Sequence, residues 1–171
     1  MISIGAVSGF IAAINTGSLF FAIIIGVLSA SVFASIHAFV TVVLKQDQTV
    51  SGLILTILGL SVSSLIGKKY VGKKLDVKLE SVVNIAEPDS ILDIFLSQNI
   101  IFYLGILLMV ATAYVLKRTM FGRRLEAIGE DLKSSDSMGL KIAKTQFIAT
   151  CVGGAFAGLS GVYLTLSYVP Y

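Results

Sequence analysis

Residues 118–146 read RTMFGRRLEAIGEDLKSSDSMGLKIAKTQ and form a polar stretch between two long apolar runs. Apolar side chains recur at helical spacing through this stretch, at Phe121, Leu125, Ile128 and Leu132. This spacing is typical of an amphipathic helix that turns one face toward an apolar surface. The first half of the stretch is therefore predicted to be helical.

A second, shorter helix is predicted immediately afterwards, over residues 132–138. Asp131 is placed as its N-cap residue, and Gly139 is placed to end it as the C′ residue. A helix of about seven residues is too short to stand alone in water, so it needs a surface to press against. That surface belongs either to its own chain or to another protein.

Two interpretations of residues 118–146 compete. The ordinary one is a solvated loop that joins two membrane helices, as most charged segments between spans are. The other is a docking element that transmits force between a partner protein in the cytoplasm and the membrane helices. Composition alone does not decide between them, so both stay open.

The composition is that of an integral membrane protein. Of the 171 residues, 56% are hydrophobic and 13% are charged, and the mean hydropathy is +0.92. Soluble domains carry roughly 25% charged residues, and here the apolar residues also lie in long blocks. The net charge of +3 suits loops that lie against anionic lipid headgroups of a bilayer. It does not indicate a nucleic-acid partner, because the basic residues sit at the ends of the apolar runs without interleaved aromatic residues.

These blocks predict an all-α fold: a polytopic transmembrane helical bundle, with about four to five membrane segments in a single domain over residues 1–171. The expected segments are residues 2–14, 18–44, 49–67, 100–116 and 147–166. The first is only about 13 residues long, which predicts a truncated span or a re-entrant piece. Both ends of the chain are abrupt and no basic region precedes the first apolar run, so we expect a fragment without a signal peptide.

Small residues recur at the spacing of close contacts between helices. Gly26, Ala30, Ala34 and Ala38 follow one another every four residues in the second apolar run. Gly154, Gly158 and Gly161 lie in the last run. Small residues at this spacing let two helix backbones approach closely, so both sets are predicted to be helix-packing positions.

The distribution of lysine and arginine indicates which ends of the spans face the cytoplasm. The turn at Lys45 and residues 118–146 share one side if the two spans between them both cross. That side carries eight basic residues, Lys45, Lys117, Arg118, Arg123, Arg124, Lys133, Lys141 and Lys144. The opposite side carries five, Lys68, Lys69, Lys73, Lys74 and Lys78. The positive-inside rule therefore places residues 118–146 in the cytoplasm and residues 68–99 outside it.

The sequence contains no constellation for catalysis, metal binding or cofactor binding. All ten acidic residues lie outside the apolar runs, so the buried charge that proton-coupled carriers use is missing. His37 is the only one of the Asp, Glu, Lys, Arg and His residues that lies within a run, and we expect it to be neutral and hydrogen-bonded to the backbone. Residues 67–69 lack the glycine loop and the Ser or Thr of a Walker A motif. The chain is thus predicted not to be an enzyme, and any nucleotide chemistry would belong to a partner.

Residues 122–166, GRRLEAIGEDLKSSDSMGLKIAKTQFIATCVGGAFAGLSGVYLTL, resemble the signature region of permease subunits of bacterial ABC importers. The group they are most similar to is the simple-sugar and nucleoside permeases, which are related to ribose and branched-chain amino-acid permeases. Residues 37–58, HAFVTVVLKQDQTVSGLILTIL, resemble a second segment of the same group. The departures from the family pattern are Asp131 for the capping Asn, Leu132 for Pro, Ser134 and Ser135 for an alanine pair, and Glu126 for Arg.

The resemblance implies that residues 118–146 are a cytoplasmic coupling loop seated in a groove of an ATP-binding subunit. The partner-coupling residues that it implies are Glu126, Ala127, Gly129, Glu130, Asp131, Ser134, Ser135 and Gly139. It also implies a multi-pass protein of the cell membrane, paired with a second permease subunit and supplied by an extracytoplasmic substrate-binding protein near residues 68–99. The implied function is ATP-driven import of nucleosides or simple sugars by alternating access.

Two further interpretations remain open at this point. One is a self-contained channel or facilitator for small polar solutes, and the other is a membrane scaffold without transport. Three polar residues near or within the apolar runs, Asn15, Ser51 and Thr56, are candidates for a substrate path. Each of the three also has an ordinary packing explanation.

Overall fold

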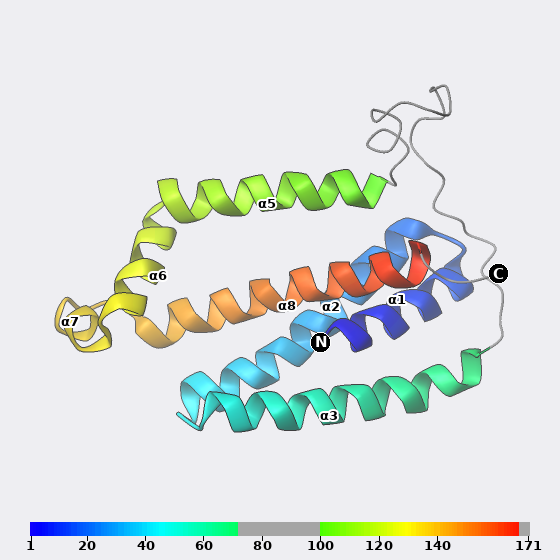
Figure 1. Cartoon of the computed structure of the whole chain (residues 1–171), viewed down its shortest axis with the longest axis horizontal. Helices are drawn as coiled ribbons and strands as arrows, with labels where there is room; N and C mark the ends of the chain where they lie inside the picture. Colours follow the sequence, from blue (N-terminus) through cyan, green and yellow to red (C-terminus); the bar gives the residue numbers. More distant parts are fainter. Residues whose placement is uncertain (72–99, 168–171) are drawn as a thin grey trace, which may run out of the picture.

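In the computed structural model, residues 1–71 and 100–167 are described, and every element among them is helical. The helices are α1 (Ile2–Thr16), α2 (Leu19–Ala38), α3 (Gln48–Gly67), α5 (Ile100–Arg118), α6 (Met120–Glu130), α7 (Leu132–Ser137) and α8 (Ile142–Ser167). A short π-helix, η1 (Phe39–Val43), continues α2, and a 3₁₀ turn, η2 (Lys68–Tyr70), follows α3. The predicted all-α helical bundle is confirmed (Figure 1).

Four helices of the described part are long and apolar enough to cross a membrane. They cover Leu19–Val43, Gln48–Tyr70, Ile101–Arg118 and Ile142–Leu166, which confirms the four long runs predicted from the sequence. The start predicted for the last run, residue 147, is wrong, because α8 already begins at Ile142. The polar residues that precede the apolar run are already helical. The Thr145 N–H and hydroxyl both donate to the Lys141 carbonyl, each at 3.1 Å.

The first apolar run forms α1, which is shorter than the four candidate spans. Gly17 follows its last residue in the left-handed conformation (φ 61°), and its N–H donates to the Ala13 carbonyl at 2.9 Å. Glycine adopts this conformation without steric cost, so the chain reverses sharply into α2. As a result α1 packs against both α2 and α8.

The core of the molecule is a close packing of α1, α2 and α8 (Figure 1). All four alanines at Ala22, Ala30, Ala34 and Ala38 of α2 are fully buried. A Cβ added to Gly158 of α8 would lie 2.7 Å from the Ala30 Cβ and 2.8 Å from the Gly26 carbonyl oxygen. The helices therefore meet backbone to backbone, which only small residues allow.

The other small residues of α8 also lie in these contacts. Gly154 faces Ala34 of α2, and Gly161 faces the backbone of Ile2 at the start of α1. Gly5 of α1 faces Gly158, where an added Cβ would lie 2.7 Å from the Gly158 Cα. Gly26, Ala30, Ala34, Gly154, Gly158 and Gly161 thus lie at the three-helix contact, and Ala38 is buried at the end of α2. α1 adds glycines that the sequence pattern did not single out.

α3 and α5 lie on opposite sides of this core in Figure 1. α3 packs against α1 and α2, whereas α5 packs against α6. Both helices turn large apolar side chains outward, and Leu53 of α3 and Leu107 of α5 are each 65% exposed. Apolar faces of this length suit contact with lipid chains.

The segment predicted to be extracytoplasmic, residues 68–99, falls almost wholly outside the described residues. Only residues 68–71 of it are described, as the 3₁₀ turn after α3 and the residue that follows. Residues 168–171, at the other end, also lie outside.

Candidate functional site

The polar stretch between α5 and α8 is folded into α6 and α7, which join the ends of the two long helices (Figure 1). Thr119 caps α6: its hydroxyl accepts the Gly122 N–H at 3.4 Å and donates to the Val115 carbonyl at 2.6 Å. Gly122 lies against the backbone of Leu116 so closely that a Cβ at this position would overlap it. Glycine at position 122 thus fixes the direction in which α6 leaves α5.

α6 is the amphipathic helix that the sequence predicts. Ile128 is buried, Phe121 and Leu125 are partly buried, and the charged residues of α6 are exposed. The inclusion of Leu132 in the same apolar face is wrong, because Leu132 belongs to α7 and is 52% exposed. The chain changes direction at Asp131, so the helical spacing no longer relates Leu132 to the residues before it.

Asp131 marks the corner between α6 and α7 and caps α7, as predicted. Its backbone is extended, and its carboxylate accepts the Lys133 N–H at 2.9 Å and the Ser134 hydroxyl at 2.5 Å. The hydrogen bond from the Ser134 hydroxyl, with that from the Lys133 N–H, favours the charged carboxylate and holds the pKa of Asp131 below its ordinary value of 3.8. Ser134 therefore strengthens the cap.

Ser135 fastens α7 to α6. It is 1% exposed, and its hydroxyl donates to the Ala127 carbonyl of α6 at 3.0 Å. A bond of this kind adds about 0.5–1.5 kcal/mol and, more importantly, fixes the angle between two short helices. The sequence suggested only a small residue on a contact surface, because the partner of Ser135 lies in the preceding helix.

The C-terminal end of α7 is closed by backbone hydrogen bonds. Its last residue is Ser137, one before the predicted end, and Gly139 adopts the left-handed conformation (φ 72°) predicted for it. The Gly139 N–H donates to the Asp136 carbonyl at 2.9 Å, and the Leu140 N–H donates to the Ser135 carbonyl at 3.2 Å. α7 is thus a helix of 6 residues whose two ends are both closed by hydrogen bonds.

The eight residues expected to contact a partner fall into two groups. The exposed group comprises Glu126, Gly129, Glu130, Asp131, Ser134 and Gly139. Ser135 is buried and Ala127 is half-buried, and the hydrogen bond from the Ser135 hydroxyl to the Ala127 carbonyl holds α6 and α7 together. Around Gly129 the surface is open, since an added Cβ would meet no atom within 4 Å. The exposed group is the part most available to a second protein.

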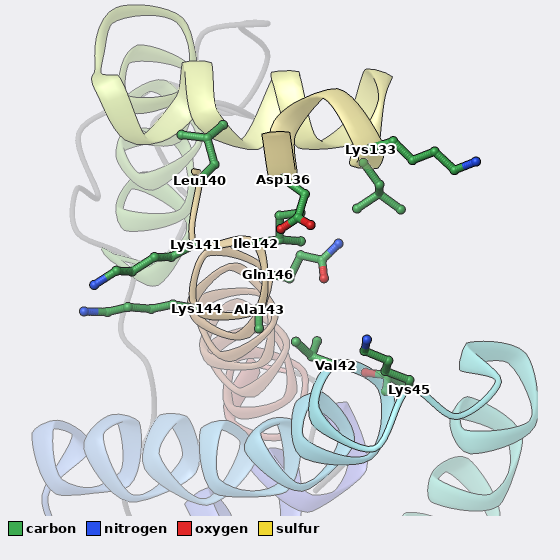
Figure 2. Close-up of a pocket in the computed structure, with 12 residues that line it drawn as sticks. Val42, Lys45, Lys133, Asp136, Leu140, Lys141, Ile142, Ala143, Lys144 and Gln146 are labelled. Atoms are coloured by element: carbon green, nitrogen blue, oxygen red, sulfur yellow. The ribbon is translucent and has the colours of Figure 1, made fainter. Parts of the chain in front are cut away.

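A pocket of about 780 Å³ lies between α7, the start of α8 and the end of η1 (Figure 2). Thr41 and Lys45 line one side, and Asp136 of α7 and Gln146 of α8 line the other. Sequence reasoning did not find this pocket, because its two sides are far apart in the chain. No local spacing relates the end of the second apolar run to the polar stretch.

The three residues proposed for a substrate path are not brought together. Asn15 is exposed near the end of α1, and Thr56 is exposed on α3, where its hydroxyl donates to the Gly52 carbonyl at 2.8 Å. Ser51 is buried, and its hydroxyl lies 3.1 Å from Nδ1 of His37. The expected backbone partner of His37 is thus replaced by a side chain of α3, which links the end of α2 to the start of α3.

The cap at Asp131 gives α7 a stability that depends on pH. Because the pKa of Asp131 is lower in the folded chain than its ordinary value of 3.8, the cap is complete above that value and is lost as the pH falls through the folded-state pKa. Amide hydrogen exchange over residues 132–138, corrected for the intrinsic rate, should therefore speed up only as the pH falls below this ordinary value of 3.8. Asp131→Asn, which keeps a capping oxygen that does not titrate, should remove this acid step. An equal acid step in the Asn variant would contradict the assignment.

Fold and site together define a class: a multi-pass helical membrane protein that holds a short, capped helix outside its spans. The model of the family described as "branched-chain amino acid transport system / permease component" matches residues 1–170. The chain belongs to this family.

Individual relatives agree with this assignment. A protein provisionally named as a glucose ABC transporter permease, TsgC13 of Haloferax volcanii, is 28% identical over 98% of this chain and 53% of its own length. The guanosine ABC transporter permease protein NupQ of Bacillus subtilis is 30% identical over 78% of this chain and 44% of its own. The nucleoside ABC transporter permease protein NupC of Lactococcus lactis is 26% identical over 94% of this chain and 55% of its own. The chain thus spans about half the length of these curated relatives.

No solved structure gives a significant match to the chain. The resemblance to the simple-sugar and nucleoside group of ABC importer permeases is confirmed by the family and by these relatives. With four apolar helices long enough to span, the chain is a multi-pass protein of the plasma membrane.

Proposed function

We propose that the chain forms the membrane-spanning part of an ATP-driven importer and moves nucleosides or simple sugars by alternating access. ATP is hydrolysed by a separate ATP-binding subunit, and the chain itself performs no chemistry. The observation that carries this proposal is the geometry of α7, a helix closed at both ends and fastened to α6 outside the spans. The substrate class follows from the glucose, guanosine and nucleoside permeases among the relatives.

α7 is held rigidly, so a force applied to it displaces the helix as a unit. Asp131 fixes its start, Ser135 ties its middle to α6, and Gly139 closes its end. Both α6 and α7 pack against α8, so a displacement of α7 moves the beginning of that helix. α8 in turn meets α2 through backbone contacts at Gly158, which leave no flexible side chain between the two helices. The push therefore reaches the core of the spans.

The surface offered to the ATP-binding subunit is the exposed group on α6 and α7. Glu126 and Glu130 place negative charge on α6, and Gly129 lies between them with open space above it. A glycine without neighbours lets a partner's backbone approach the helix closely. We assign this surface, within residues 118–146, to the cytoplasmic groove of the partner.

The remaining partners follow from the same orientation. With residues 118–146 in the cytoplasm, residues 68–99 face the outside, where a substrate-binding protein delivers its ligand. A second permease subunit completes the path across the membrane. The exact ligand is best found by a thermal-shift screen of that substrate-binding protein against nucleosides and simple sugars; a rise in melting temperature with one class identifies it.

Transport by the reconstituted complex tests the proposal. The complete permease, its ATP-binding subunit and its substrate-binding protein are placed in liposomes, and uptake of labelled nucleoside or sugar is measured. Accumulation against a gradient should require both ATP and the ATP-binding subunit. Flux that persists without either of them would contradict the proposal and favour a self-contained channel or facilitator. No flux under any condition would favour a scaffold.

A further inference from the structure

The pocket beside α7 has one wall that is held as a unit. Asp47 caps α3 by accepting the Thr49 and Val50 N–H groups at 2.8 and 3.0 Å. The hydrogen bond between His37 and Ser51 links α2 to α3 close to the turn between η1 and α3. The turn between η1 and α3 is thus fastened on both sides, so it moves with the α2–α3 pair.

Lys45 lies in this turn in an unusual conformation. Its φ is 53°, and it is the one non-glycine residue with positive φ in the described part of the chain. A lysine in the left-handed region persists only where its surroundings impose it, and such positions are frequent at functional sites. The π-helix that precedes it, with the Leu44 N–H bonded to the Phe39 carbonyl at 3.1 Å, is also a form of helix common at functional positions.

The polar side chains around the pocket point in different directions (Figure 2). Asp136 of α7 and Gln146 of α8 point into the gap on the side where Lys45 lies, whereas Lys141 and Lys144 project from the other side of α8. Lys45 and Asp136 carry opposite charges on the two walls. Both are exposed, and neither makes an ion pair with any residue that the structure describes.

We propose that the gap closes during the transport cycle and that Lys45 and Asp136 then form an ion pair that latches α7 to the α2–α3 turn. The inference rests on the proposed role of α7 in coupling. Closure removes water from between the two charges, and the attraction between them strengthens as the local dielectric constant falls. The latch therefore favours the closed state over the open one and gives the push on α7 a second route into the core, through α2.

A charge swap tests the latch in the complete, reconstituted complex. Lys45→Glu and Asp136→Lys should each lower ATP-driven uptake by about threefold, the size of effect expected for a partly exposed ion pair. The double variant with the charges exchanged should return to the unmodified rate. Lys144→Glu is the matched control, because Lys144 lines the same pocket but points away from Asp136. Combined with Asp136→Lys, it should restore nothing.

Crosslinking gives an independent readout of the same contact. In a Cys151→Ser background, which removes the one cysteine of the 171 residues, Lys45→Cys and Asp136→Cys should form a disulfide in one nucleotide state and not in the other. Equal crosslinking with and without ATP, or a double charge variant no better than the weaker single variant, would overturn the latch. If the unmodified complex itself shows no ATP-driven uptake, the proposed function fails and the latch with it; normal uptake without charge rescue would overturn the latch alone.

Discussion

Gly158→Val should break the contact between α2 and α8 and leave a protein that does not assemble stably. The first added carbon would already lie 2.7 Å from the Ala30 Cβ and 2.8 Å from the Gly26 carbonyl oxygen. Because backbone lies on the other side, the neighbour cannot turn away, and α8 must move. Overpacking of this kind costs about 3 kcal/mol or more. The loss should appear as aggregation or a broad profile in size-exclusion chromatography of the detergent-solubilised protein, and as a lower melting temperature.

Gly153→Val is the matched control for this prediction. Gly153 lies on the same helix, five residues before Gly158 and on a different face, and an added Cβ there would meet no atom within 4 Å. The two substitutions are chemically identical, so a difference between them reports packing alone. Equal stability of the two variants would contradict the backbone-to-backbone contact that joins α8 to the core.

Gly129→Trp should separate ATP hydrolysis from transport. Gly129 lies in open space on α6, so an indole there should leave the fold and the melting temperature of the permease unchanged. If the ATP-binding subunit seats against this surface, the bulky side chain should disturb the contact with α6, so that ATP hydrolysis by the bound subunit no longer moves the permease. We expect ATP-driven uptake to fall more than about tenfold, the loss that 1.4 kcal/mol of misplaced contact would cause.

Gly129→Ala is the control, since one methyl group at an open position should leave uptake near the unmodified rate. ATP hydrolysis and uptake are measured in the same vesicles, so that loss of coupling can be told from loss of the complex. Normal uptake by the Trp variant would show that this face of α6 is not part of the partner's seat.

Much of the architecture follows from local rules in the sequence. The four spans are visible as long apolar runs because a membrane span requires that length. α7 is visible because Asp131 and Gly139 carry the side chain and the backbone freedom that a helix needs at its two ends. These features depend on residues a few positions apart, and sequence patterns predict structure over that range.

What the sequence does not reveal depends on contacts between distant residues. Ser135 could not be assigned to the Ala127 carbonyl, because the angle between α6 and α7 decides which side of α7 is covered. No sequence pattern pairs His37 with Ser51. The left-handed backbone conformation of Lys45 could not be predicted either, because lysine usually adopts other regions of φ and ψ. The pocket exists only once α2 and α7 are placed in space.

A coupling role for α7 requires that this helix face the cytoplasm and that the ATP-binding subunit cover it. Met138, at the end of α7, is 68% exposed, and Met138→Cys in a Cys151→Ser background leaves one thiol, at this point, among the 171 residues. A membrane-impermeant maleimide should label it in inside-out vesicles and not in intact cells, and the bound ATP-binding subunit should protect it. Labelling in intact cells, or labelling that the ATP-binding subunit does not change, would contradict a cytoplasmic coupling helix.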